Sequence, residues 1–318
     1  MCEKVFYYKR PAGLKYFFSS IPYIVKTRSP EELLGNLEQL PFPILFEGIH
    51  TTGFHNHKAL NTRHKIIRTH NIEYKYYRNL TRSEKNLFRK IFFLSESVKL
   101  NRYEKRLSGK IKIAAISEND KIHYRQCGYD AHYIPAFHPF DTVMSLEGTG
   151  DYILYHGDLS VPDNEKSAMF IIEKIDGQTQ FPLIVAGKDP SEILKKAGTA
   201  SQNIKIIENP SSGEMSDLIM NAHINLLHSY QATGIKIKLL YSLFQGRHCL
   251  VHKNVIINSG LDDLCHTWET DDQLIEKIRQ LTDKSFTKTE SEKRNKKLHD
   301  NFSNRKNTAR LLGLAKLH

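Results

Sequence analysis

Short apolar runs alternate with polar segments of helical spacing from residue 43 onward. In the first half, the runs predict strands at 44–46, 65–68, 111–116 and 132–135. Helical spacing predicts one helix over about 81–107, with Gly109 as its stop, and a second over 118–127, with Ser117 as its cap. This alternation is typical of a parallel sheet covered by helices.

The same alternation restarts after residues 137–150, which carry Pro139, Gly148 and Gly150 and little periodicity. It predicts strands at 152–155, 183–185, 204–207, 224–228 and 249–251, with helices at 164–175, 190–197, 213–222 and 235–245 and a helical tail over 271–316. We therefore expect an α/β protein with two Rossmann-like domains facing across a cleft. The predicted division is an N-terminal domain at 1–138, a linker at 139–150, a C-terminal domain at 151–282 and a tail at 283–318.

Composition is that of a globular protein: 318 residues, 40% of them hydrophobic and 25% charged. No apolar run approaches the roughly 18–20 residues that span a bilayer. The first eight residues lack a signal-peptide layout, and the four cysteines lack paired metal spacing. We expect a cytoplasmic protein, either free in solution or peripheral at the inner membrane face.

Positive charge is concentrated in the first half. Residues 1–140 hold 24 Lys and Arg against 12 Asp and Glu, whereas the net charge of the whole chain is +11. Basic residues at 78–106 alternate with apolar ones such as Phe88 and Ile91. A basic half favours a polyanionic partner, either nucleic acid or an acidic membrane surface; an ordinary solvated helix face explains any single lysine equally well.

The most informative stretch is 231–247. The predicted strand at 224–228 leads into a loop that ends in Thr233 and Gly234, and a helix follows that Gly246 closes. Polar groups after the strand and N–H groups at the helix start favour an anion such as a diphosphate. The candidate residues are Thr233, Gly234, Lys236 and Lys238. Lysines two positions apart diverge by about 200° on a helix, so the alternative that one is simply solvated stays open.

Further polar clusters follow other predicted strands. They contain Glu47 and His50; Arg68, His70, Asn71 and Glu73; Gly157 and Asp158; and Lys188. His70 is the best acid–base candidate because imidazole exchanges a proton near neutrality, and we place Glu47 with it as catalytic. A structural histidine in a turn is the competing interpretation of His70, and Asn71 is equally suited to cap the next helix.

Several motifs that bind dinucleotides, phosphates or metal ions are absent from the sequence. It has no GxGxxG or Walker lysine loop and no D-x-D pair at a strand end. We therefore expect no cofactor and no metal at the active site, with phosphate charge balanced by Lys and Arg.

Five segments together resemble bacterial GT-B glycosyltransferases related to the large family-four group of retaining, nucleotide-sugar-dependent transferases. They are 46–51, 68–73, 156–160, 186–190 and 233–240, in the right order over about residues 41–310. The resemblance implies a nucleotide-diphosphate sugar donor held by the C-terminal domain and a glycan or lipid-linked acceptor on the N-terminal domain. Donor-side residues would be Gly157, Asp158, Lys188, Thr233, Gly234, Lys236 and Lys238, and acceptor-side residues His50, Arg68, Asn71 and Glu73, with His70 facing the transferred sugar.

The chain departs from that group in two places. Two glutamates that the group carries eight positions apart are replaced by Thr233 and Tyr241, so donor preference does not carry over. The region before Pro41 has no strand followed by a Gly-rich loop, so the first domain is expected to be incomplete. Two alternatives follow: an inactive truncated relative that binds nucleotide or acts as a scaffold, and a nucleic-acid-binding protein, although no nucleic-acid module fits and we expect no nucleic acid partner.

Overall fold

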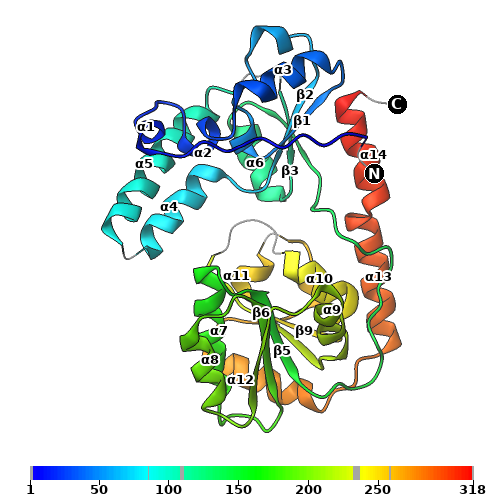
Figure 1. Cartoon of the computed structure of the whole chain (residues 1–318). Coiled ribbons are helices and arrows are strands. Elements are labelled where there is room, and N and C mark those ends of the chain that lie inside the picture. The colour runs from blue at the N-terminus through cyan, green and yellow to red at the C-terminus, as the bar shows by residue number, and fades with distance from the viewer. Residues whose placement is uncertain (1–2, 85, 108–110, 232–236, 258, 317–318) are drawn as a thin grey trace. The chain divides into compact units, whose positions relative to one another are not determined.

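The computed structural model describes residues 1–318 except 1–2, 85, 108–110, 232–236, 258 and 317–318 (Figure 1). The chain divides into two compact units. Unit 1 comprises residues 1–135 and 305–318, and unit 2 comprises residues 136–304. The two-domain α/β prediction is confirmed, while the cleft between the domains stays a prediction. The sequence predicted a linker at 139–150 and a tail at 283–318. In the structure, Gly148 of the predicted linker forms an antiparallel bridge with Phe286 of unit 2. The described part of the predicted tail from Arg305 onward belongs to unit 1.

Unit 1 is built on a four-stranded parallel sheet in the order β1-β2-β3-β4. The strands are β1 (Ile44–Glu47), β2 (Lys65–Thr69), β3 (Lys112–Ala115) and β4 (Asp130–Tyr133). Its helices are α1 (Leu14–Phe17), α2 (Tyr23–Lys26), α3 (Glu31–Gln39), α4 (Glu73–Ser83), α5 (Leu87–Glu104), α6 (Glu118–Gln126) and α14 (Asn304–Ala315), with 3-10 turns η1 (Ile49–Thr51) and η2 (Lys58–Leu60).

Two helix predictions in unit 1 meet different outcomes. Ser117 caps α6 as expected, since its side chain accepts a hydrogen bond from the Asp120 N–H at 3.1 Å. The single helix predicted at 81–107 is wrong. The structure has two helices there, because the Asn86 side chain accepts from the Arg89 N–H and starts α5 as a new helix.

Unit 2 contains a six-stranded parallel sheet in the order β10-β9-β8-β5-β6-β7. The strands are β5 (Ile153–Asp158), β6 (Leu183–Lys188), β7 (Ile204–Glu208), β8 (Ile224–Leu227), β9 (His248–His252) and β10 (His266–Trp268). Its helices are α7 (Pro162–Ile175), α8 (Glu192–Thr199), α9 (Ser212–Asn221), α10 (Ile237–Gln245), α11 (Lys253–Ile256), α12 (Asp271–Thr282) and α13 (Lys288–Phe302), with the 3-10 turn η3 (Asp262–Leu264).

Helices cover both faces of this second sheet (Figure 1). Alternate strand residues such as Tyr155 and Val185 are buried against α7, α8 and α12, and Leu154 and Ala186 are buried against α9. Strands that are buried on both faces consist of continuous apolar residues, and for this reason they could be predicted from the sequence. Among the described helices, none combines the length and the apolar character needed to cross a bilayer.

Candidate active site

The second sheet reverses its winding between β5 and β8. From β5 the chain proceeds through β6 and β7 on one side, and through β8, β9 and β10 on the other. Open α/β sheets bind ligands outside the carboxyl ends of the strands at such a switch point. Here β5 ends in Gly157 and Asp158, and His228 follows the end of β8. Together with Asn164 and Lys238 these residues form what we call the donor corner.

Lys238, in the first turn of α10, bridges the two sides of the donor corner. Its Nζ lies 3.3 Å from Oδ1 of Asn164 and 3.2 Å from the His228 carbonyl oxygen. The ammonium also lies 4.9 Å from the ring centroid of Tyr155. A cation is therefore fixed at the switch point, where a phosphate group would meet it as a point charge.

Two glycines let the ends of β5 and β6 approach each other. Gly157 pairs with Gly187 in the parallel register. A Cβ on Gly187 would lie 1.9 Å from the Gly157 carbonyl oxygen, a distance that the backbone excludes. A Cβ on Gly157 would lie 3.3 Å from Asn164. Gly187 is thus required by packing, and the absence of a side chain at Gly157 lets Asn164 lie close to the end of β5.

The remaining predicted donor residues have less specific surroundings. Asp158 folds onto its own turn, since its Oδ1 accepts from the N–H and Oγ of Ser160 at 3.1 and 2.6 Å. Lys188 is 69% exposed and lies 3.8 Å from Asp189. Thr233, Gly234 and Lys236 lie outside the described residues, so their predicted roles stay predictions.

In unit 1, the carboxyl ends of β1 and β2 bring three predicted residues together. Nε2 of His70 lies 2.8 Å from Oε2 of Glu47, and Nη1 of Arg68 lies 3.4 Å from Oε1 of the same carboxylate. Burial alone would raise the pKa of Glu47, but the hydrogen bond from His70 and the charge of Arg68 outweigh it and lower that pKa. Since an ionised carboxylate only accepts, His70 donates through Nε2, and Nδ1 is the atom it presents to another partner.

His50 and Glu73 complete the acceptor corner, which we define as Glu47, His50, Arg68, His70 and Glu73. Burial, followed by the charges of Arg28 and His70, lowers the pKa of His50 to about 4. Burial raises the pKa of Glu73 to about 7, against the charges of His70 and Arg28. At neutral pH, His50 is therefore uncharged, while Glu73 titrates close to neutrality and can exchange a proton there.

One of the two predictions for the start of α4 is wrong. Asn71 does not cap α4: the residue at the cap position is Ile72, and no side-chain hydrogen bond caps this helix. Glu73 does lie in the first turn of α4, as expected. The sequence did not single out Arg28, because its approach to His50 depends on how the segment before β1 packs.

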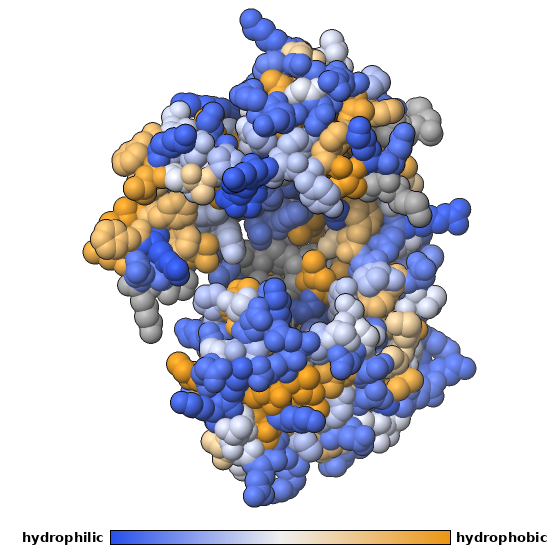
Figure 2. All heavy atoms as spheres, viewed as in Figure 1, coloured by the Kyte–Doolittle hydropathy of each residue, from blue (hydrophilic) through white to orange (hydrophobic). Residues whose placement is uncertain are grey.

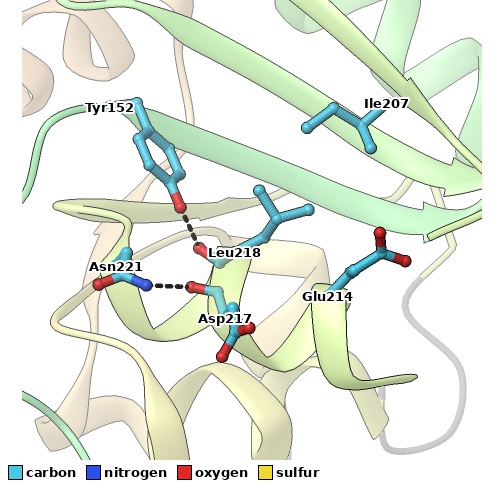
Figure 3. Close-up of a pocket in the computed structure, with 6 residues that line it drawn as sticks. All are labelled: Tyr152, Ile207, Glu214, Asp217, Leu218 and Asn221. Atoms are coloured by element: carbon cyan, nitrogen blue, oxygen red, sulfur yellow. Dashed lines mark hydrogen bonds between the residues drawn. The ribbon is translucent and has the colours of Figure 1, made fainter. Parts of the chain in front are cut away.

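A cavity of about 280 Å³ in unit 2 shares no lining residue with the donor corner (Figure 3). Tyr152, Ile207 and α9 line it, the Tyr152 hydroxyl donates to the Leu218 carbonyl at 2.8 Å, and the Asn221 amide donates to the Asp217 carbonyl at 2.9 Å. It contains none of the predicted site residues. The switch point, where the Lys238 ammonium is fixed, remains the better candidate for an anionic ligand.

The chain is similar to known proteins in sequence and in fold. No family model matches the chain. An uncharacterized 44.6 kDa protein in the cps region of Klebsiella pneumoniae is 24% identical over 256 residues, which is 76% of this chain and 65% of that protein.

Solved structures align with both units. Sucrose-phosphate synthase from Thermosynechococcus elongatus is 11% identical with a TM-score of 0.68, covering 96% of this chain and 80% of that one. HepE of Anabaena, in complex with UDP and glucose, is 9% identical with a TM-score of 0.61, covering 89% and 80%. TarM of S. aureus, in complex with Fondaparinux, α-GlcNAc-glycerol and UDP, is 11% identical with a TM-score of 0.60. That alignment covers 83% of this chain and 52% of TarM, so this chain spans about half of that protein. These likenesses show that the chain has the GT-B fold of these glycosyltransferases.

Proposed function

We propose that this protein is a glycosyltransferase that moves a sugar from a nucleotide-diphosphate donor to a glycan or lipid-linked acceptor. The observation that carries the proposal is the donor corner: a lysine fixed at the switch point of a GT-B C-terminal unit, where its ammonium contacts Asn164 and the His228 carbonyl oxygen. HepE and TarM, which share the fold, were solved with UDP. The relative in the cps region supports a role in cell-surface polysaccharide synthesis.

In this proposal the donor corner binds the diphosphate and the acceptor corner contacts the transferred sugar. Lys238 neutralises charge on the diphosphate as it leaves, which lowers the barrier to breaking the sugar–phosphate bond. His70 contacts the transferred sugar through Nδ1, and Glu47 holds the imidazole in that tautomer. Cationic side chains in place of a metal ion balance the phosphate charge.

Calorimetric titration with a panel of nucleotide diphosphates and their sugars tests the proposal. We expect heat of binding with at least one nucleotide series, and measurable hydrolysis or transfer of the matching sugar when acceptor glycans or lipids are added. Binding without any turnover would favour the alternative of an inactive relative, to which the replaced glutamates at positions 233 and 241 point. Binding of no nucleotide would overturn both.

We also propose that an anionic membrane surface is the partner of unit 1, because α5 presents an apolar face to solvent. Leu87, Ile91, Leu94 and Val98 recur at helical spacing and are 68, 53, 53 and 46% exposed, and Phe88 beside them is 84% exposed. Figure 2 shows apolar side chains gathered over the end of the molecule where α4 and α5 lie in Figure 1. Large exposed apolar patches mark interaction sites.

The second apolar element beside α5 is α1, which reaches it through stacked Phe17 and Phe92 rings 6.0 Å apart. Leu14 and Phe18 of this segment are 80 and 81% exposed. The exposed Lys15 and Lys90, next in sequence to Leu14 and Ile91, carry positive charge beside these apolar side chains. Apolar insertion combined with basic side chains is the pattern by which interfacial helices bind anionic lipid, and it would bring a lipid-linked acceptor to the unit 1 side.

A further inference from the structure

Three side chains of the kind that bind transition metals converge at one end of the unit 2 sheet. They are His248 of β9, His266 of β10 and Glu290 of α13, and one ligand atom from each lies within 4.8 Å of the others. His266 pairs with Leu250 in the parallel register, so His248, two residues earlier, lies on the same face of the sheet. Both histidines begin their strands, at the opposite end of the sheet from the donor corner.

His248 is held in the geometry of a metal ligand. Its Nε2 lies 2.8 Å from the Lys284 carbonyl oxygen, and because a carbonyl only accepts, the proton is on Nε2 and Nδ1 keeps its lone pair. The residue is 1% exposed, and Nδ1 has no hydrogen-bond partner among the described residues. A histidine that donates one ring nitrogen to a backbone carbonyl and keeps the lone pair on the other is the usual arrangement around bound metals.

An ordinary structural role accounts for only part of this cluster. Glu290 closes a capping box at the start of α13, where its Oε2 accepts from the N–H and Oγ1 of Thr287 at 2.9 Å, and its Oε1 lies 2.9 Å from Nζ of Lys284. Capping explains the carboxylate but leaves the buried Nδ1 of His248 without a hydrogen-bond partner among the described residues. A cation that takes the place of the Lys284 ammonium on Oε1 would satisfy both groups.

We propose that His248, His266 and Glu290 bind one transition-metal ion of the Zn²⁺ type, which ties α13 to β9 and β10. Imidazole nitrogens together with a carboxylate select Zn²⁺, Co²⁺ or Ni²⁺ over Mg²⁺ and Ca²⁺. Three protein ligands leave a fourth, tetrahedral position for water. The site stabilises unit 2 and takes no part in the chemistry at the donor corner, so the proposal is independent of the proposed function.

The test is metal binding by the full chain after treatment with a chelator. Zn²⁺ is titrated calorimetrically, and Co²⁺ is titrated by its visible absorption, which reports tetrahedral nitrogen and oxygen ligands. We expect one equivalent bound, and a melting temperature that rises with Zn²⁺ concentration. Glu290→Gln and His266→Gln each weaken Zn²⁺ binding by at least about tenfold.

The variants are chosen to keep the fold. Glutamine at position 290 still serves a capping box, so Glu290→Gln removes the ligand charge and leaves the start of α13 intact. His299→Ala, on the same helix with a side chain 61% exposed, is the matched control and binds Zn²⁺ as the native chain does. Failure of the native chain to bind one equivalent, or unchanged binding in both glutamine variants, would overturn the proposal.

Discussion

Nε2 of His70 and Oε2 of Glu47 are 2.8 Å apart where β1 and β2 end side by side. This contact fixes the tautomer of an imidazole that we propose contacts the transferred sugar. We expect His70→Ala to lower the rate of sugar transfer by about 10²-fold or more, the usual cost of losing a positioned acid–base group. Glu47→Gln keeps an acceptor for His70 and removes the charge, so its loss should be smaller, about tenfold. Steady-state transfer assays with the donor identified by calorimetry measure both.

Unit 1 provides its own control for this experiment. His132 makes a similar contact, with its Nε2 2.8 Å from Oδ1 of Asp130, on β4 and outside the acceptor corner. His132→Ala should leave transfer unchanged. An equal loss in the His70 and His132 variants would show that the effect is structural and would remove His70 from the proposed site.

Lys238 provides a test of the donor corner that needs no acceptor. Lys238→Met keeps the length of the side chain and removes its charge. Because a hydrogen bond to a charged group contributes about 1.5–3 kcal/mol, we expect binding of the nucleoside diphosphate to weaken by about 10- to 100-fold. Binding of the nucleoside without phosphates should stay the same, a separation that general destabilisation would not produce. Lys205→Met, at an exposed position on β7, is the control.

Gly187 is a test of the close packing of β5 and β6. Since a Cβ there would lie 1.9 Å from the Gly157 carbonyl oxygen, Gly187→Ala must displace backbone. We expect it to lower the free energy of unfolding by about 1–3 kcal/mol or more. Gly213→Ala in α9 meets no atom within 4 Å and should be neutral or stabilising by up to about 1 kcal/mol. Urea unfolding of both variants measures the difference, and equal stabilities would contradict the steric argument.

The sequence was sufficient for nine of the ten strands in the described residues but not for their order. Apolar runs such as Ile153–Tyr155 and Ile224–Leu227 are visible because both faces of these strands are buried. That β8 lies beside β5 depends on pairing between segments about 70 residues apart, which no local pattern encodes. That pairing is what brings Lys238 to Asn164, so the sequence indicated the lysine and could not indicate its partner.

Helices and strands that are too short or too polar to show a hydrophobic periodicity were not predicted from the sequence. β10 is three residues long, and its His266 and Thr267 are not fully buried, so nothing in the sequence marks it as a strand. The helices before β1 include two of only four residues. Both omissions concern proposed sites, because Arg28, whose charge lowers the pKa of His50, follows α2, and β10 supplies one of the proposed metal ligands.

Membrane binding by unit 1 depends on the exposed face of α5. Replacing Phe88 and Ile91 together with serine removes two side chains that are 84 and 53% exposed, and core packing should be unaffected. Because inserting such a side chain contributes about 1.5–3 kcal/mol, we expect binding to vesicles containing phosphatidylglycerol to weaken by at least about tenfold. Ile193→Ser, 71% exposed on α8 of unit 2, is the control.

Lipid composition distinguishes this surface from a protein-binding one. In co-sedimentation, the native chain should bind phosphatidylglycerol vesicles more strongly than pure phosphatidylcholine vesicles, and added salt should weaken the binding. Absence of vesicle binding at low salt would show that the apolar face has another partner.

The stability of unit 1 should fall as pH rises, because it buries acids in their neutral form. Glu104 is 4% exposed, and burial, with the nearby charge of Glu73, raises its pKa to about 8. Burial likewise raises the pKa of Asp120 to about 6. Each group holds a proton in the folded state that the unfolded chain releases near pH 4–5. Folded protein therefore binds more protons than unfolded protein between those values, and stability is lost across that window.

Glu104→Gln tests this assignment. The amide mimics the protonated acid and retains an oxygen that can accept from the Tyr74 N–H, which lies 3.3 Å from Oε1 of Glu104 in the native chain. Little change in stability is therefore expected at pH 5. At pH 9 the variant should be more stable than the native chain, since each titrating group contributes up to about 1.4 kcal/mol per pH unit within its window. Urea unfolding at pH 5, 7 and 9 measures the slope. Glu192→Gln, whose side chain is 80% exposed, should retain the native slope, and an identical slope in the Glu104 variant would exclude this residue as the source of the pH dependence.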